Sequence, residues 1–481
     1  MKQLEFDVAV IGGGPAGTVA AIASARRGAK TILVEQNGYL GGALTACGTG
    51  PQMTYHAGDV QVVRGIPQEM EEEMIRRGFS TGHIPDAVGF CSSTTAFDPE
   101  GMKIVWEDMA REAGVTLMYH TVFTGCTVEN GVIRTARLYT KGGFYELSAK
   151  VFVDASADAD VATSAGVTSV YGREEDNLAQ PMTMNFHVYG VDREKVCDFV
   201  LNNLDDMARY TPRNLRELRH YDISGAFSRI QAAKDAGEFH IDRDTVLCFE
   251  TNTDGEYVVN MTRIAKHSAV DPFDLTEAEI EGRKQVQETL RFLKKYIPGF
   301  ENCHLAFSGP NIGIRESRKV DGVYKLTAED LTDNVMFPDA IAMGGYPIDV
   351  HSPDGGNTVH KFLKPGSWYS VPYRSLVTPG VENLIVAGRC LSATRSVLSG
   401  ARTQAHGDRQ AASTAAAKCA RTCLQISWIQ TLCASSLRRT AFFWKSISLD
   451  APHFIINNDE QPHCGKVPQR GCFLFVKKAS S

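Results

Sequence analysis

A glycine-rich stretch near the start of the chain, VAVIGGGPAGTVAAIASARRGAKTILVE at residues 8–35, constrains the fold more than any other feature. The β-branched apolar run at residues 6–11 predicts a short buried strand that ends at glycine. An alanine-rich helix is expected over residues 18–27, with Gly28 in a position that favours a helix end. A second strand is expected at residues 31–34 and completes a βαβ unit.

The glycines of this unit have the spacing of a dinucleotide-binding turn, G-x-G-x-x-G. Gly12 allows the tight turn, Gly14 lets the backbone approach a pyrophosphate, and Gly17 permits close packing of helix on strand. Glu35 follows Gly17 by 18 residues, and it can accept hydrogen bonds from the ribose of an adenosine. The predicted cofactor-binding residues of the unit are Gly12, Gly14, Pro15, Ala16, Gly17 and Glu35. A purely structural turn is the alternative interpretation.

A membrane span is the other alternative for this stretch, because residues 8–25 contain no charged side chain. Their length of 18 residues is at the lower limit for crossing a bilayer. However, glycines and a proline lie in the middle, where a strand, a turn and a helix each account for their own part. We therefore predict no membrane partner.

Charge and cysteine usage limit the partners and the compartment. The chain has 481 residues and a formal net charge of −6, and it has no basic block that would track phosphates, so we predict no nucleic-acid partner. Its 12 cysteines are scattered, without the spacing of a zinc site or a disulfide scaffold, which predicts a reducing cytoplasm and no metal. We find no export signal in the first residues.

The segment after Glu35 favours FAD over NAD. Gly41 and Gly42 stand six and seven residues past the carboxylate, in QNGYLGGALTACGTG. An NAD domain has no standing need for such a loop, whereas an FAD enzyme must run extended backbone beside the ribityl chain. In this respect the chain resembles the glutathione-reductase-type FAD superfamily, in which a Gly-Gly loop follows the second strand. The resemblance implies FAD as cofactor.

A second block lies in the middle of the first half of the chain. Turn signals at residues 130–131 and 142–143 predict a β-meander that feeds a strand at residues 151–154 and then a helix. The sequence VDASADADVATSAGV is similar to a pattern of bacterial FAD-dependent oxidoreductases, D-A-[ST]-G-D-G-D-x-A-x-x-A-G. Ala157 replaces the usual glycine. Asp158 and Val122 are predicted as further cofactor contacts; a carboxylate in a first helical turn is the alternative for Asp158.

The third block, VENLIVAGRCLSATRSVLSGARTQAHGDRQAASTAAAKCA, covers residues 381–420. A buried strand at residues 384–387, a turn at Gly388 and an alanine-rich helix are expected. The block resembles the closing segment of the same family, although Ser413 stands where glycine is expected. By this resemblance, Gly388 is a cofactor-binding residue and the helix start points amides at the flavin.

Taken together, the resemblance covers residues 5 to about 420, with several blocks in order. It implies an α/β fold: a Rossmann-like FAD-binding domain, with a parallel sheet, helices and a β-meander, and an inserted α+β substrate domain. We expect the FAD-binding domain at residues 1–170 and 365–423 and the substrate domain at 171–364.

Candidate catalytic residues lie in the middle third. Arg315 and Arg318 are candidates for clamping a carboxylate; the alternative is that they pair with Glu316 or other nearby acids on the surface. His351 follows the alternating segment YPIDV and starts a loop, which suits an acid or base, although a structural histidine is the alternative. Weaker candidates are His360, Tyr369, Tyr373 and Arg374.

The cysteines argue against two redox chemistries. A disulfide reductase needs a C-x-x-x-x-C pair after the Gly-Gly loop, but Cys47 stands alone there, as a packing residue or a reactive thiol. Cys419, Cys423 and Cys433 do not have ferredoxin spacing, so no iron–sulfur cluster is carried over from the heterodisulfide reductase flavin subunit, a loose relative of this family.

Residues 424–481 form an atypical tail with no sustained helical or strand period. A frameshift that replaced the native end is one hypothesis, and a disordered extension is the other.

The sequence predicts an FAD-dependent oxidoreductase that transfers a hydride between flavin and a small organic substrate. A flavin monooxygenase and a flavin-binding protein without turnover are the alternatives. The electron acceptor or donor is not identified, and a homo-oligomer stays open.

Overall fold

The computed structural model describes residues 2–208, 214–355 and 358–401, which lie within one compact unit, Met1–Trp428. The tail at 424–481 and the alanine-rich stretch expected at the end of the third block, with Ser413, lie outside the described residues. The same holds for Cys419, Cys423 and Cys433.

The largest sheet has the strand order β8-β2-β1-β11-β10-β9, and β23 also pairs with β11. Its strands are β1 (Lys2–Ile11), β2 (Thr31–Val34), β8 (Thr116–Met118), β9 (Val122–Glu129), β10 (Val132–Thr140), β11 (Gly143–Asp154) and β23 (Leu384–Val386). Strands β8, β2, β1, β11 and β23 pair in parallel, whereas β9, β10 and β11 form an antiparallel meander. The predicted α/β fold with a Rossmann-like parallel sheet is confirmed.

The elements of the opening βαβ unit form as predicted, with shifted ends. Strand β1 begins at Lys2 rather than Phe6, and helix α1 (Pro15–Arg26) begins earlier than predicted, because proline fits the first helical position. The hairpin at Asn130 and Gly131 is confirmed by φ angles of 53° and 74°. The strand expected at 151–154 is the end of the longer β11, since no strand-breaking residue interrupts it after Gly143.

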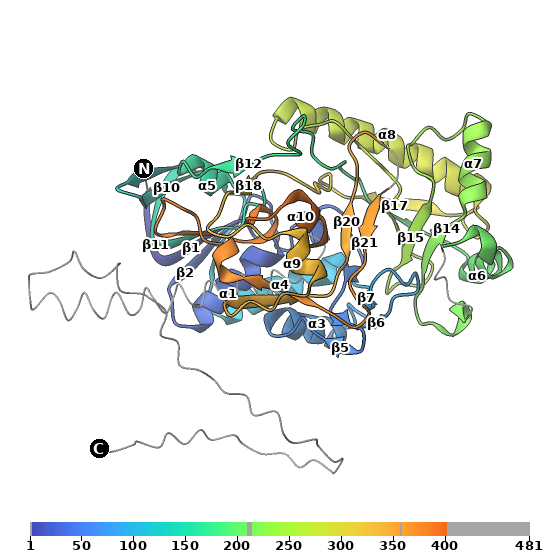
Figure 1. Ribbon diagram of the computed structural model, residues 1–481, viewed down its shortest axis with the longest axis horizontal. Coiled ribbons are helices and arrows are strands. Elements are labelled where there is room, and N and C mark those ends of the chain that lie inside the picture. The colour runs from blue at the N-terminus through green and yellow to red at the C-terminus, as the bar shows by residue number, and fades with distance from the viewer. Residues whose placement is uncertain (1, 209–213, 356–357, 402–481) are drawn as a thin grey trace, which may run out of the picture. The chain divides into compact units, whose positions relative to one another are not determined.

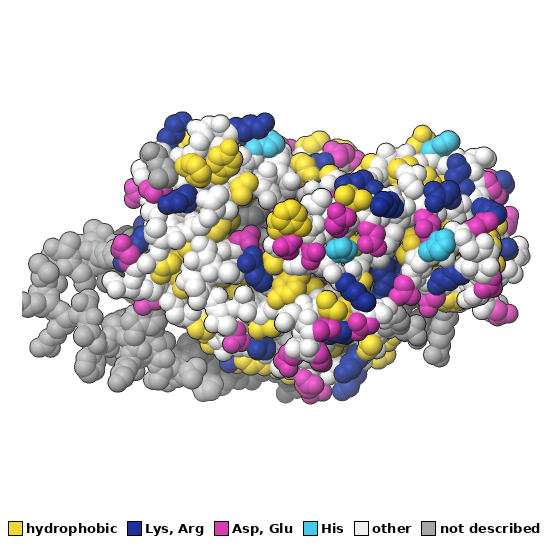
Figure 2. Space-filling model, turned by 90° about the horizontal axis from the view of Figure 1, so that it is seen from above, with side chains coloured by type: hydrophobic (Ala, Val, Ile, Leu, Met, Phe, Trp, Pro, Cys, Tyr) yellow, Lys and Arg dark blue, Asp and Glu magenta, His cyan; other side chains and the backbone are white. Residues whose placement is uncertain are grey.

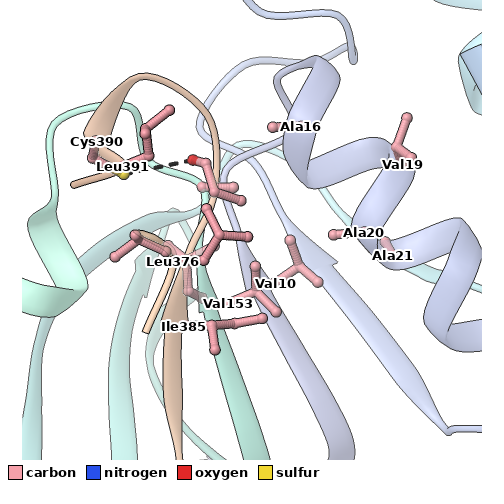
Figure 3. Packing of buried hydrophobic residues seen from close by; sticks show 14 of the residues in the cluster. Val10, Ala16, Val19, Ala20, Ala21, Val153, Leu376, Ile385, Cys390 and Leu391 are labelled. Carbon is pink, nitrogen blue, oxygen red and sulfur yellow. Dashed lines mark hydrogen bonds between the residues drawn. The ribbon is translucent and has the colours of Figure 1, made fainter. Parts of the chain in front are cut away.

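Helix α1 packs on the sheet through small side chains. Figure 3 shows Val10 of β1, Val153 of β11 and Ile385 of β23 gathered beneath the face of α1 that carries Ala16 and Ala20. Because alanine projects so little, the helix approaches the strands closely, and its first turn is held at the carboxyl ends of β1 and β11. The same region of the core includes α3 (Ile66–Arg76) and α4 (Pro99–Glu112).

A second, antiparallel sheet has the order β14-β15-β16-β13-β17. Its strands are β13 (Phe186–Tyr189), β14 (Asp222–Gly225), β15 (Val246–Glu250), β16 (Tyr257–Val259) and β17 (His304–Ser308), with the helices α6 (Arg193–Asn202), α7 (Phe227–Asp235) and α8 (Pro272–Tyr296). These elements share a separate hydrophobic cluster, which gives this region the α+β character that the sequence predicts. In Figure 1 they lie on the right, away from α1.

Shorter elements connect these two parts. The short helices are α2 (Ala43–Ala46), α5 (Asp160–Ser164), α9 (Ala328–Thr332) and α10 (Arg395–Ala401). The short strands are β3 (Gln52–Met53), β4 (His56–Ala57), β5 (Val60–Gln61), β6 (Ile84–Pro85), β7 (Ser93–Thr95), β12 (Ser169–Val170), β18 (Lys319–Val320), β19 (Ala340–Gly344), β20 (Ile348–Val350), β21 (Val359–Lys361) and β22 (Tyr369–Pro372). Single 3-10 turns lie at Leu204–Asp206, Leu215–Glu217, Tyr373–Ser375 and Gly388–Cys390. Buried residues from Val320 to Ile348 join the cluster under α1, and the predicted domain boundaries stay a prediction.

The surface shows mixed charge. On the face shown in Figure 2, Lys and Arg side chains are interspersed with Asp and Glu. Within the described residues, no helix has both the length and the apolar character needed to cross a membrane.

Candidate functional site

A cavity of about 940 Å³ joins the first turn of α1 to the second sheet. From the α1 side it is lined by Gly14, Pro15, Ala16, Gly42, Ala43, Leu44, Ala155, Ala157, Gly388 and Arg389. From the other elements it is lined by charged and polar residues that include Asn185, Asp242, Arg243, Asn260, Arg263, Arg315, Asp349, His351, Thr358 and His360. In Figure 1, β20 and β21 lie between α1 and β15. The structure thus brings many of the predicted site residues to one cavity.

The tight turn after β1 requires glycine at two positions. Gly12 has a φ of +108°, and a Cβ there would lie 2.2 Å from the carbonyl oxygen of Ala155. A Cβ on Gly17 would lie 1.9 Å from the carbonyl oxygen of Gly12. These two glycines therefore allow the helix and the strands to approach each other, as the sequence predicts.

The start of α1 has space for an anion. Gly14 caps the helix with no side-chain hydrogen bond, and Pro15 occupies the first turn. A Cβ on Gly14 would meet nothing nearer than the Cα of Gly42, 3.9 Å away, so the helix start opens into the cavity. Amide groups at a helix N-terminus attract negative charge, and these residues fit the pyrophosphate of a dinucleotide.

Glu35 connects the turn to the end of β2. Its Oε2 accepts a hydrogen bond from the Gly13 amide at 2.6 Å, and its Oε1 accepts from the Asn37 amide at 2.7 Å. Burial raises the pKa of the Glu35 carboxyl, while the hydrogen bonds from Asn37 and Gly13 act in the opposite direction. A ribose hydroxyl that donates to this carboxylate would further favour its charged form.

The Gly-Gly loop packs on the turn. The Gly41 amide donates to the carbonyl of Gly13 at 2.9 Å, and a Cβ on Gly42 would lie 2.9 Å from the Cα of Gly14. Val122 is 44% exposed and begins β9 directly after Thr121, whose amide donates to the carbonyl of Glu35 at 3.1 Å. Gly41 and Val122 do not line the cavity, but both lie beside residues that form the turn.

Asp158 is held by arginines rather than open to the cavity. Arg389 donates to its carboxylate at 2.6 Å, and Arg318 donates to its carbonyl at 2.7 Å. It precedes α5, so the carboxylate in the first turn of that helix is Asp160, whose pKa is raised to about 6 by burial and by Asp158 and Asp154. Asp158 therefore lies behind the cavity wall formed by Ala157 and Arg389.

His351 lines the cavity together with two residues of a β-hairpin. The Nε2 atoms of His351 and His360 lie 3.3 Å and 3.1 Å from the two carboxylate oxygens of Asp349. Asp349 in β20 stands opposite His360 in β21, and Thr358 Oγ1 lies 3.1 Å from His351 Nδ1. With a carboxylate at Nε2, the tautomer protonated at Nε2 is favoured, which leaves Nδ1 as an acceptor for the Thr358 hydroxyl or for a substrate proton.

The two arginines predicted to bind a carboxylate lie in different surroundings. Arg315 lines the cavity, whereas Arg318 pairs with Asp160 at 2.5 Å. Glu316 is buried and pairs with Lys319 and Arg395.

Of the weaker candidates at residues 360–374, one lines the cavity and the others do not. His360 lines the cavity. Tyr369 is fully buried in β22, and Arg374 pairs with Asp339 at 3.0 Å. Tyr369, Tyr373 and Arg374 do not line the cavity.

Sequence reasoning missed several residues of the cavity. Asp349 stands two residues before His351, and the alternation of a strand places such residues on one face, so this signal was present. Arg389 follows Gly388 directly, and its guanidinium donates to the carbonyl of Ile314 at 2.6 Å. Arg243 and Arg263 gave no signal, because a single arginine among polar residues is typical of any surface.

Cys47 is a packing residue. Its side chain is buried, its Sγ lies 3.5 Å from the carbonyl of Ile312, and burial raises the pKa of the thiol to about 12. Such a thiol is neutral at physiological pH and a poor nucleophile. Among the described residues no group of His, Cys, Asp or Glu side chains is arranged to hold a metal ion.

Comparisons with known proteins agree with this geometry. The model of the FAD dependent oxidoreductase family matches residues 7–439. Digeranylgeranylglycerophospholipid reductase of Methanosarcina acetivorans is 27% identical over 222 residues, which are 42% of this chain and 49% of that protein. Thiamine thiazole synthase of Aeropyrum pernix is 56% identical over 43 residues, which are 9% of this chain and 16% of that protein. The match to the reductase spans about half of its length.

Solved structures with a similar fold include a geranylgeranyl bacteriochlorophyll reductase-like protein from Thermoplasma acidophilum. Its TM-score is 0.44 and its identity is 13%, over 89% of this chain and 84% of that one. Another is p-nitrophenol 4-monooxygenase from Pseudomonas putida, with a TM-score of 0.46, 12% identity and coverage of 90% and 83%. Because the family model covers most of the sequence, the protein is an enzyme that uses FAD and belongs to the FAD-dependent oxidoreductase family.

Proposed function

We propose that the protein transfers a hydride between FAD and a small organic substrate bound in the cavity. The observation that carries the proposal is that one cavity is lined both by the open start of α1 and by His351, Asp349 and His360. The proposed cofactor site and a group able to transfer a proton therefore lie in one cavity, as hydride chemistry requires.

In this proposal the turn at Gly12–Gly17, Glu35 and the Gly41–Gly42 loop hold FAD. Gly388 lines the same cavity, and Val122 and Asp158 lie in segments beside the residues that hold FAD. When bound, FAD supplies a hydride acceptor or donor at its N5 atom. The chain supplies the proton transfer: His351 Nδ1 takes or returns the substrate proton, while Asp349 positions the imidazole from its Nε2 side, 3.3 Å away. Arg315 orients the substrate from the cavity wall.

Purified protein tests the proposal. We expect an absorption band at about 450 nm from bound flavin, and bleaching of this band by one member of a panel of small carboxylates, amines and sugars under argon. His351→Asn should slow the bleaching by about 100-fold, as loss of a general acid or base does. His240→Asn, at a side chain that is 72% exposed, is the matched control.

The alternatives give different results in the same experiment. Oxygen consumption with hydroxylated product, and no anaerobic bleaching by the substrate itself, would indicate a monooxygenase. A yellow protein that no compound in the panel bleaches would contradict the proposal and indicate a flavin-binding protein without turnover.

The unpaired thiols of the described cysteines support the cytoplasm as compartment.

A further inference from the structure

The part of the cavity formed by the second sheet and its loops contains two arginines that the hydride-transfer proposal does not use. Arg243 precedes β15, and Arg263 follows β16. Both line the cavity. The guanidinium of Arg243 donates to the backbone carbonyl of Asn260 at 2.9 Å, and that of Arg263 donates to the carbonyl of Ser352 at 2.6 Å.

Both guanidinium groups have buried donors without an acceptor. The Nε atoms of Arg243 and Arg263 are buried, and neither makes a hydrogen bond within the described residues. Arg263 is 9% exposed, and the nearest carboxylate, from the exposed Asp242, lies 3.8 Å from its Nε. Arg243 has no ion pair among the described residues. The Nε atoms are closed off from the cavity, so a ligand would be held by the Nη1 groups of the two arginines, which have no acceptor among the described residues.

The two arginines also repel each other. Burial lowers the pKa of Arg243, and the charge of Arg263 lowers it further, while the carboxylates of Asp244, Asp349 and Asp242 act in the opposite direction. An anion placed between two guanidinium groups removes this repulsion and accepts charge-assisted hydrogen bonds from both.

The lining combines charged side chains of both signs with apolar ones. The cationic side chains of the lining are Lys234, Arg243, Arg263, Arg315 and Arg389, and the acidic ones are Asp86, Asp242, Asp244 and Asp349. Arg389 is neutralised by Asp158 at 2.6 Å, so the lining is close to neutral, and the two arginines rather than an excess of charge would select a carboxylate. Val88, Phe90, Leu247 and Phe249 line the same cavity and suit an apolar body.

We propose that Arg243 and Arg263 bind the carboxylate of the substrate, so that the protein acts on a small organic acid with an apolar body. This inference rests on the proposed function for the identity of the cavity as a substrate site, and it adds the chemical class of the substrate and the residues that select it.

Titration calorimetry of the FAD-loaded protein tests the anion site without turnover. Benzoate, benzamide and inorganic phosphate are titrated at equal ionic strength. We expect benzoate to bind about tenfold or more tightly than benzamide or phosphate. Arg243→Met and Arg263→Met should each weaken benzoate binding by about tenfold or more. Arg291→Met, at an exposed residue of α8, is the matched control and should bind benzoate like the wild type.

Equal binding of benzoate and benzamide by the wild type would overturn the inference, and so would unchanged benzoate binding in both methionine variants. If a methionine variant fails to fold, the comparison of benzoate with benzamide in the wild type still decides, and Arg243→Lys and Arg263→Lys keep the charge. Benzoate binding without anaerobic bleaching by any acid would contradict hydride transfer alone. Bleaching by an uncharged substrate together with no benzoate binding would contradict the carboxylate site alone.

Discussion

Gly14 and Gly17 belong to the same turn but meet different surroundings. A side chain at Gly17 would collide with the backbone of Gly12, whereas a side chain at Gly14 would enter the cavity near Gly42. One glycine is thus needed for packing, and the other leaves space for the cofactor.

We expect Gly14→Ala to fold, with a loss of less than about 1 kcal/mol in the free energy of unfolding of the apoprotein, and to bind FAD about tenfold or more weakly. Gly17→Ala should lower the free energy of unfolding by about 3 kcal/mol or more, because the backbone must move. Fluorescence titration with FAD and thermal melts measure both effects. Gly142→Ala is the control, since its Cβ would meet only Thr140 Oγ1 at 3.6 Å. Equal FAD affinity in Gly14→Ala and the wild type would contradict the assignment of the site.

Ala157 adopts a backbone conformation that alanine disfavours. Its φ is +71°, at the position where the pattern that this block resembles has glycine. A left-handed conformation costs an L-residue about 1–2 kcal/mol, and glycine avoids that cost at an entropic expense of about 0.5–1 kcal/mol.

Ala157→Gly should therefore raise the free energy of unfolding by about 0.5–1 kcal/mol. Denaturant unfolding of the apoprotein measures it. Ala165→Gly, in the same region but with a φ of −81°, should be destabilising instead. A loss of stability in Ala157→Gly would show that the alanine side chain contributes more by packing than its backbone strain costs.

At the scale of elements, His83 connects α3 to β7. Its Nε2 lies 2.9 Å from Gln68 Oε1 of α3, and its Nδ1 lies 2.7 Å from Thr95 Oγ1 of β7. Burial, with a smaller contribution from His56, lowers the pKa of His83 from 6.5 to about 4. The unfolded chain therefore binds a proton that the folded protein does not bind between these pH values.

Because the folded pKa is lowered, this histidine favours folding above about pH 6.5, and the contribution is lost as the pH falls toward about 4. We expect the melting temperature of the wild type to fall from pH 7 to pH 5, and that of His83→Gln to fall less. Thermal melts across this range measure the difference. His304→Gln, at an exposed histidine, should follow the wild type. Parallel curves for His83→Gln and the wild type would contradict the expectation.

The hairpin of β20 and β21 positions the proposed proton-transfer group. Register places Asp349 opposite His360, and the carboxylate lies 3.3 Å from His351 Nε2. A carboxylate at this distance orients the imidazole and favours its charged form.

Asp349→Asn should slow anaerobic flavin reduction by about tenfold or more and move the acid limb of the pH–rate profile to lower pH, because the charge that favours the imidazolium is gone. Stopped-flow absorbance at the flavin band measures both. Asp59→Asn, at an exposed loop, is the control. A slower rate with an unmoved acid limb would assign Asp349 a structural role only.

The proposed FAD site lies on elements from both ends of the described chain. Strand β1 and helix α1 come from the start, and β23 and Gly388 come from near residue 388. A ligand that binds these segments together binds only the folded state.

We expect FAD at 100 times its dissociation constant to stabilise the apoprotein by about 2.7 kcal/mol. Riboflavin, which lacks the pyrophosphate, should give a much smaller shift of the melting temperature at the same concentration. Differential scanning calorimetry of the stripped protein measures both. Equal shifts with the two compounds would contradict a pyrophosphate site at the start of α1.

The parts of the protein that could be predicted from the amino-acid sequence are those that depend on local order. The βαβ unit, the meander and the strand before Gly388 follow from periodicity and from glycines at fixed spacing, because a turn such as that at Gly12 needs a positive φ that glycine adopts readily. The chain's membership in an FAD-dependent family was predicted from the same blocks, and the family match confirms it.

The distant side chains that share the cavity could be identified only in the folded chain. Arg315 and Arg318 are three residues apart, yet only Arg315 lines the cavity, whereas Arg318 pairs with Asp160. Arg243 and Arg263 enter from loops beside the second sheet, and nothing in their local sequence distinguishes them from surface arginines. The physical reason is that turns and strands depend on neighbouring residues, while the burial and charge of a side chain depend on whatever the folded chain brings against it.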